Sequence, residues 1–167
     1  MTMQIGESFV GEGAEAAHVN TVLGVRSGPV GTAWATALAT PSAGHAPFVA
    51  VVRPGVPARP ATLFVNKAAI ESDRHAELTW GAAQAGVAAG VLDAVAEGLV
   101  ADPDDLVLIA AVWVNPKAAD ADLVYANNRS ATREAIRAGA TNTPSVADAL
   151  AVRHEPSNPF YTPSGDK

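Results

Sequence analysis

The feature that most constrains the fold is the unbroken apolar run LVLIAAVWV at residues 106–114. A run of this length between Asp105 and Asn115 predicts a strand at the centre of a sheet. A second strong pattern lies at residues 82–99, where a valine or leucine recurs every fourth position and predicts an amphipathic helix. A chain of 167 residues that mixes such segments is expected to form one α/β or α+β domain.

Weaker patterns predict the other elements. Strands are expected at 15–23, 48–52 and 62–70, and helices at 32–39, 120–138 and 145–153. We expect the folded domain to cover residues 1–160 and residues 161–167 to be a C-terminal tail.

Composition excludes several classes of function. The net charge of −6 argues against a nucleic-acid or anionic-membrane partner, and the absence of cysteine excludes disulfides and thiolate zinc sites. The chain has neither a signal-peptide pattern at its start nor an apolar stretch of membrane-spanning length, so a cytoplasmic location is expected. No metal site is predicted, because the histidines lack a ligand-like spacing; they are residues 18, 45, 75 and 154.

Glycine-rich loops do not form a phosphate-binding motif. GVRSGPVGT (residues 24–32) lacks the lysine of a P-loop, and Gly11-Glu12-Gly13 lacks the third glycine of a dinucleotide fingerprint.

The strand predicted at 15–23 carries the first candidate site residues. Its alternation places Ala17, Val19 and Thr21 on one face and His18 and Asn20 on the other. Two polar side chains at i and i+2 can touch one ligand. The alternative is that His18 is a hydrogen-bonded histidine at a sheet edge.

Two further polar residues fall in apolar surroundings. Lys67 lies within the strand predicted at 62–70, where its ammonium either reaches solvent or is directed at a ligand. Gln84 falls on the apolar stripe of the helix predicted at 82–99, so its amide needs a partner, either a backbone group or the edge of a ligand.

Four segments together resemble one family. They are VGEGAEAAHVNTVLG, PATLFVNKAAI, TWGAAQAGVAAGVLDAVAEG and the acidic turn before LVLIAAVWV. In this order, over residues 4–160 and without a large gap, they resemble the formaldehyde-activating enzymes. These hydro-lyases condense formaldehyde with tetrahydromethanopterin.

The resemblance implies an α+β fold similar to the second domain of ribosomal protein S5, with a mixed sheet packed with helices. It also implies a homopentameric ring with pterin sites between adjacent subunits. His18 matches the catalytic histidine, Lys67 a pterin-binding lysine, Gln84 a pterin-contacting glutamine and Val49 an apolar contact position. No permanently bound cofactor is implied, because tetrahydromethanopterin is a cosubstrate.

Two positions depart from the family pattern. Asn20 stands where the family has an aspartate, and Ala69 where it has a threonine. Two functions are therefore expected from the sequence. One is formation of 5,10-methylenetetrahydromethanopterin and water with His18 as general acid. The alternative is a homologue that binds a reduced pterin or a formaldehyde adduct as carrier or sensor, without useful turnover.

Overall fold

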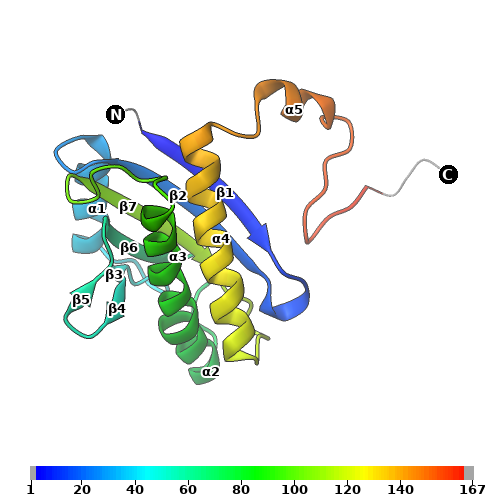
Figure 1. The fold of residues 1–167 in the computed structure, drawn as a ribbon. Helices are drawn as coiled ribbons and strands as arrows, with labels where there is room; N and C mark the ends of the chain where they lie inside the picture. Colours follow the sequence, from blue (N-terminus) through cyan, green and yellow to red (C-terminus); the bar gives the residue numbers. More distant parts are fainter. Residues whose placement is uncertain (1–2, 164–167) are drawn as a thin grey trace.

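The predicted central strand is β7 (Leu106–Trp113), and it lies in the middle of a five-stranded sheet. The computed structural model describes residues 3–163 of the chain (Figure 1). The strands lie in the order β1 (Gln4–Val10), β2 (Ala17–Val25), β7, β6 (Ala61–Asn66) and β3 (Phe48–Val49). β7 runs antiparallel to β2 and parallel to β6, so the sheet is mixed, as expected.

Two long helices cover one face of this sheet. α3 (Gln84–Ala96) and α4 (Ala121–Thr141) lie side by side against it (Figure 1). Their backbones approach closely at Gly90, which has no side chain. A Cβ atom added there would lie 2.4 Å from the carbonyl oxygen of Arg129. The core between helices and sheet consists of fully buried aliphatic side chains, among them Val19, Leu108, Val87 and Val91. The observed class is therefore α+β.

Shorter elements complete the fold. They are a 3₁₀ turn (Gly13–Glu15), α1 (Pro29–Ala39), β4 (Val51–Arg53), β5 (Val56–Pro57), α2 (Asp73–Glu77), a π-helical turn (Leu78–Ala83) and α5 (Val146–Ala151). β4 and β5 form a separate two-stranded hairpin.

The strand predicted at 48–52 is interrupted. β3 pairs with β6, whereas β4 pairs with β5, and the change of partner occurs at Ala50. The amide of Ala50 donates to Thr62 of β6, and its carbonyl accepts from Ala58, the residue that follows β5. One continuous strand is wrong because the backbone groups of this buried residue serve two different neighbours.

The strand predicted at 62–70 is also too long, because β6 ends at Asn66. The Asn66 side chain donates to the carbonyl groups of Gly44 and Ala68, at 2.8 and 2.7 Å. The bond to Ala68, two residues onward, closes a local turn that ends the strand. Lys67 therefore follows the strand and does not lie at its centre.

The helix predicted at 82–99 begins earlier and ends slightly earlier than its apolar stripe indicates. The helical segment starts at Asp73, where the Ser72 side chain accepts from the backbone N–H of His75, and it continues through the π-helical turn into α3. It ends before Gly98, whose φ of +75° suits a helix terminus. The other predicted helices are present: 32–39 lies within α1, 120–138 corresponds to α4 with Asp120 as its N-cap, and 145–153 is the shorter α5.

β1 is absent from the predictions, although it forms an edge of the sheet. Its residues pair with residues 17–23 of β2, including Glu7 with Asn20 and Phe9 with His18. Gly6 lies against α4, where an added Cβ would be 1.7 Å from the carbonyl oxygen of Ala135. A glycine at this position weakens the strand signal in the sequence, but it allows β1 to pack under the helix.

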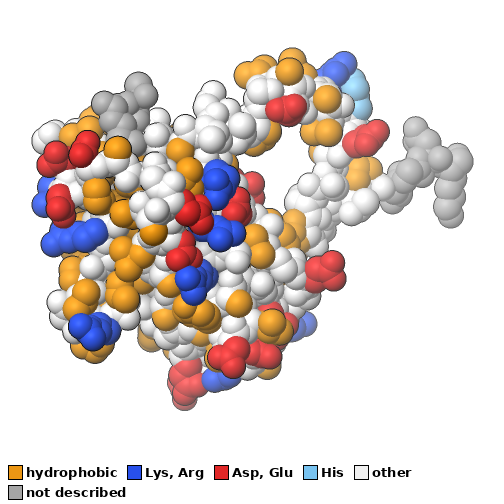
Figure 2. All heavy atoms as spheres, viewed as in Figure 1, with side chains coloured by type: hydrophobic (Ala, Val, Ile, Leu, Met, Phe, Trp, Pro, Cys, Tyr) orange, Lys and Arg blue, Asp and Glu red, His pale blue; other side chains and the backbone are white. Residues whose placement is uncertain are grey.

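Beyond α4 the chain leaves the body of the fold. Residues 141–162 are all exposed, and α5 stands away from the sheet and helices (Figure 1). Figure 2 shows both apolar and charged side chains along this arm, and interspersed acidic and basic groups over α3 and α4. Most of the tail predicted at 161–167 lies outside the described residues. Within residues 3–163, no helix is both long and apolar enough to cross a bilayer.

Candidate active site

A cleft opens on the face of the sheet opposite α3 and α4. Its volume is about 720 Å³, and β1, β2 and β7 supply its floor, with Lys67 after β6 and residues 157–160 of the C-terminal arm at its sides. The lining residues from the body of the fold are Glu7, Phe9, His18, Asn20, Lys67 and Trp113.

His18 and Asn20 lie side by side on β2 and face this cleft. The predicted alternation is confirmed: Ala17, Val19 and Thr21 are buried on the helical side, while His18 and Asn20 are partly exposed. β2 is hydrogen-bonded to β1 on one side and to β7 on the other. The alternative of a histidine at a sheet edge is therefore wrong.

Lys67 reaches both residues from the other side of β7. Its Nζ donates to Oδ1 of Asn20 at 2.7 Å and lies 3.2 Å from Nδ1 of His18. Because β7 separates β6 from β2, the lysine side chain must cross it. Ala111, the register partner of Asn20, offers only a methyl group at this crossing.

Glu7 binds the opposite edge of the imidazole. Its Oε1 lies 2.9 Å from Nε2 of His18. An ammonium has no acceptor, so Lys67 makes Nδ1 the accepting nitrogen, and Nε2–H then donates to the carboxylate. The contacts on both sides of the ring thus select, for the neutral imidazole, the tautomer that carries its proton on Nε2.

The pKa shifts at the site favour the neutral form of His18. Burial, and then the charge of Lys67, lower the pKa of His18 below 6.5, and Glu7 opposes this shift. Burial also lowers the pKa of Lys67 below 10.5, again against the effect of Glu7. Each of these two side chains therefore holds its proton less firmly than it would in water.

Glu7 is the site residue that sequence reasoning missed. In QIGESFV the residues Ile5, Glu7 and Phe9 alternate with Gly6 and Ser8, which is a short period-two pattern. Recognising this strand would have placed Glu7 on the face of His18, because neighbouring strands share their alternation.

The remaining site residues predicted from the sequence lie elsewhere. Val49 is on β3, at the far edge of the sheet from β1. Gln84 is buried, and its Oε1 accepts from the backbone N–H of Val51 at 2.5 Å, so its amide has the backbone partner considered above. Ala69 lies beside Gly44, in the loop before β3. The structure thus brings His18, Asn20 and Lys67 together in the cleft. Val49, Ala69 and Gln84 do not line it.

The other histidines are distributed across the fold. His75 is buried, and its Nε2 donates to the carbonyl of Val114 at 3.1 Å. His45 bonds the carbonyl of Asn66 through Nδ1. In the part of the chain that the structure describes, no three His, Cys, Asp or Glu side chains cluster as a metal site would require.

Comparison with known proteins identifies the family. The model of the formaldehyde-activating enzymes matches residues 5–161. The chain is 40% identical to 5,6,7,8-tetrahydromethanopterin hydro-lyase of Methanosarcina barkeri, over 93% of this chain and 89% of the relative.

Longer relatives match over part of their length. Bifunctional enzymes Fae/Hps of Archaeoglobus fulgidus and Methanococcoides burtonii are 40% and 39% identical, over 96% and 99% of this chain. In both cases the alignment spans 41% of the relative. The family match and the relative of similar length agree: this chain belongs to the formaldehyde-activating enzyme family.

Proposed function

We propose that this protein condenses formaldehyde with tetrahydromethanopterin to give 5,10-methylenetetrahydromethanopterin and water. The observation that carries the proposal is the cluster of His18, Asn20 and Lys67 in one cleft. Membership of the family, and a relative named for this hydro-lyase activity, support the same substrates.

The reaction needs one well-placed proton. A pterin amine adds to formaldehyde, and the nitrogen proton passes to the carbonyl oxygen to give a carbinolamine. The hydroxyl then leaves as water when it receives a proton, and the resulting iminium is attacked by the second amine. That amine loses its proton, so one proton is delivered and one is returned.

His18 is the proposed general acid, with Lys67 as its source of protons. Nε2–H, which donates to Glu7 in the free protein, is shared with the departing hydroxyl in the complex and gives its proton to it, while Nδ1 takes one from the Lys67 ammonium, 3.2 Å away. Ring closure returns a proton along the same path. This relay uses His18 in its neutral form, which is the form that burial and Lys67 favour.

Asn20 is proposed to hold both Lys67 and the substrate. Its Oδ1 accepts from Lys67, and its amide N–H groups remain to bind an acceptor on the pterin. Formaldehyde and the reduced pterin are thus the small-molecule partners, with tetrahydromethanopterin as a cosubstrate and no permanently bound cofactor or metal. We also propose a cytoplasmic location.

The distribution of site residues supports sites between subunits. His18, Asn20 and Lys67 lie over β2 and β7, whereas Val49 and Gln84 lie at the β3 edge of the sheet. One bound molecule reaches both groups most directly if the β3 edge of one copy lies beside the cleft of the next. We therefore propose the homopentameric ring of S5-like domains, each formed by residues 1–160, with Val49, Ala69 and Gln84 as substrate-binding residues.

Light scattering tests the assembly. The proposal requires a mass five times the 17.0 kDa of one chain. A stable monomer at micromolar concentration contradicts the ring and the shared site.

The activity is tested by mixing formaldehyde and tetrahydromethanopterin with and without the protein, and subtracting the spontaneous rate. The proposal requires an excess rate that is lost in His18→Ala. Pterin binding without an excess rate would favour a carrier or sensor. The observation behind that second candidate is that a neutral amide, Asn20, is the group that contacts Lys67.

A further inference from the structure

The C-terminal arm returns to the body of the fold at the cleft. Residues 141–162 are exposed, yet Phe160 packs on Trp113 of β7, with ring centroids 5.6 Å apart and ring planes at 88°. Residues 157–160 line the same cleft as His18, Asn20 and Lys67. We call residues 157–161 the strap.

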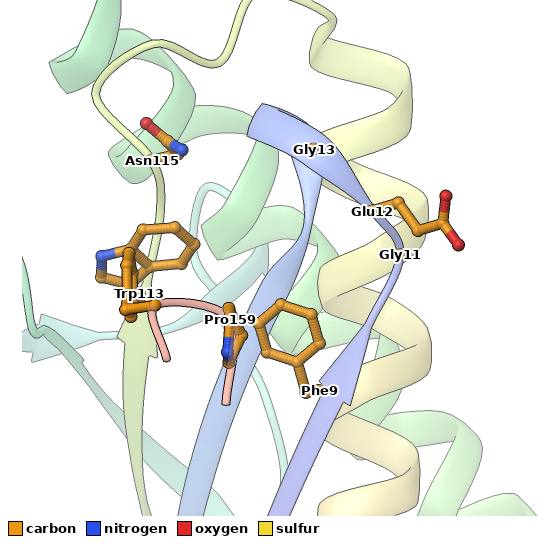
Figure 3. A pocket seen from close by; sticks show the side chains of 8 residues that line it. Phe9, Gly11, Glu12, Gly13, Trp113, Asn115 and Pro159 are labelled. Carbon is orange, nitrogen blue, oxygen red and sulfur yellow. The ribbon is translucent and has the colours of Figure 1, made fainter. Parts of the chain in front are cut away.

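The strap lies between two hollows. The catalytic cleft is on one side, and a hollow of about 370 Å³ beside the Gly11–Gly13 turn is on the other. Both are lined by Phe9, Trp113, Pro159 and Phe160. Figure 3 shows Pro159 between Trp113 on β7 and Phe9 on β1.

Hydrogen bonds within the strap hold it in a turn. The backbone N–H and carbonyl of Asn158 pair with those of Tyr161, at 2.8 and 3.0 Å. The Asn158 side chain accepts from the backbone N–H of Phe160 at 2.9 Å, and Pro159 restricts the backbone between them. The phenyl ring is thus presented by an ordered turn.

The cleft consequently has a polar floor and an aromatic wall. Phe160 is 79% exposed despite its contact with Trp113, and Phe9 is 41% exposed. Large aromatic surfaces open to solvent beside a polar cluster suit a flat ligand with polar edges. Such a ligand stacks its face on the wall and hydrogen-bonds the floor.

We propose that Phe160, supported by Trp113, binds the face of the pterin ring, so that this one ring of the strap belongs to the substrate site. This inference rests on the proposed function, because it concerns the same cosubstrate. It adds a specificity-determining residue that lies 93 residues after Lys67 in the chain, on a segment outside the sheet.

The experiment compares the unmodified protein with Phe160→Ala and with a matched control, Tyr161→Ala. Tyr161 is the next residue, is 57% exposed and does not line the cleft. Each protein is titrated with tetrahydromethanopterin under anaerobic conditions, and its kinetics with formaldehyde and its thermal melting are recorded.

We expect Phe160→Ala to raise the Kd and the KM for tetrahydromethanopterin about tenfold, because aromatic stacking contributes on this scale. Its kcat and melting temperature are expected to stay close to those of the unmodified protein, since the exposed ring takes no part in the proton relay. Tyr161→Ala is expected to match the unmodified protein, and Phe160→Trp to retain its affinity.

Different failures have different signatures. Unchanged affinity in Phe160→Ala, while the unmodified protein binds and turns over the pterin, overturns the role of the strap alone. An equal loss in Tyr161→Ala also overturns it, because the effect would not belong to the phenyl ring. An unmodified protein that neither binds nor converts tetrahydromethanopterin overturns the proposed function together with this inference.

Discussion

The Nε2 atom of His18 lies 2.9 Å from Oε1 of Glu7, across the pairing of two neighbouring strands. Together with the Lys67 contact at Nδ1, this bond fixes which imidazole nitrogen carries the proton. The carboxylate also raises the pKa of His18 against the effects of burial and Lys67. Glu7 therefore positions His18 and tunes its basicity.

Glu7→Gln tests this role. The amide keeps an acceptor but loses the charge, so we expect kcat/KM to fall roughly fivefold to tenfold, the difference between a charge-assisted and a neutral hydrogen bond. The pKa of His18 is expected to fall further, which moves the acidic limb of the pH–rate profile to lower pH. Rates measured across a pH series, with the spontaneous reaction subtracted, give both quantities.

Glu12→Gln is the matched control for Glu7→Gln. It removes the same charge from the same hairpin, and the Glu12 carboxylate points away from the aromatic side chains (Figure 3). An identical pH profile for Glu7→Gln and the unmodified protein would contradict a positioning role.

The proton relay predicts a bell-shaped pH dependence of kcat/KM. Activity requires neutral His18 and protonated Lys67, so it falls as pH drops through the pKa of His18 and as pH rises through that of Lys67. Both pKa values are lowered, which places the limbs below 6.5 and below 10.5 respectively. Steady-state rates over this range check the shape.

Lys67→Met tests the basic limb. Without the ammonium there is no proton to pass to Nδ1, so we expect kcat to fall about a hundredfold and the basic limb to disappear. Lys117→Met, at an exposed lysine, is expected to leave the profile unchanged. A basic limb that persists in Lys67→Met would assign it to another group.

Asn20→Asp restores the carboxylate of the family pattern. A carboxylate 2.7 Å from the Lys67 ammonium would raise the pKa values of Lys67 and His18, so both limbs should move to higher pH. We expect activity or pterin affinity to increase, by about tenfold for one charge-assisted hydrogen bond. Kinetics and pterin titration measure the two effects, and an unchanged or weakened response would mean that this pocket is adapted to another ligand.

The sequence predicted the elements whose pattern is local. β7 follows from its apolar run and β2 from its alternation, and that alternation also placed His18 and Asn20 on one face. β1 was not predicted, because Gly6 interrupts its short strand pattern. The close packing of β1 against α4 requires a glycine at this position. The partner change at Ala50 and the turn at Asn66 depend on contacts with distant segments, which local patterns do not contain.

Two contacts of the candidate site also could not be predicted from local sequence patterns. The bond between Lys67 and Asn20 requires β6 and β2 to lie on either side of β7, an order that the sequence pattern left open. Phe160 meets Trp113 only because an exposed arm folds back after α5. The position of Phe160 in the sequence, near the C-terminus, gives no indication of that return.

The central claim is that His18 delivers the proton on which loss of water depends. The most direct measurement is the rate of methylene adduct formation above the spontaneous reaction for His18→Ala, with His18→Gln as a variant that keeps polarity without cycling a proton. We predict a reduction of about a hundredfold or more in both, with tetrahydromethanopterin affinity changed less than about tenfold and assembly intact. Unmodified rates in well-folded His18→Ala would contradict the account.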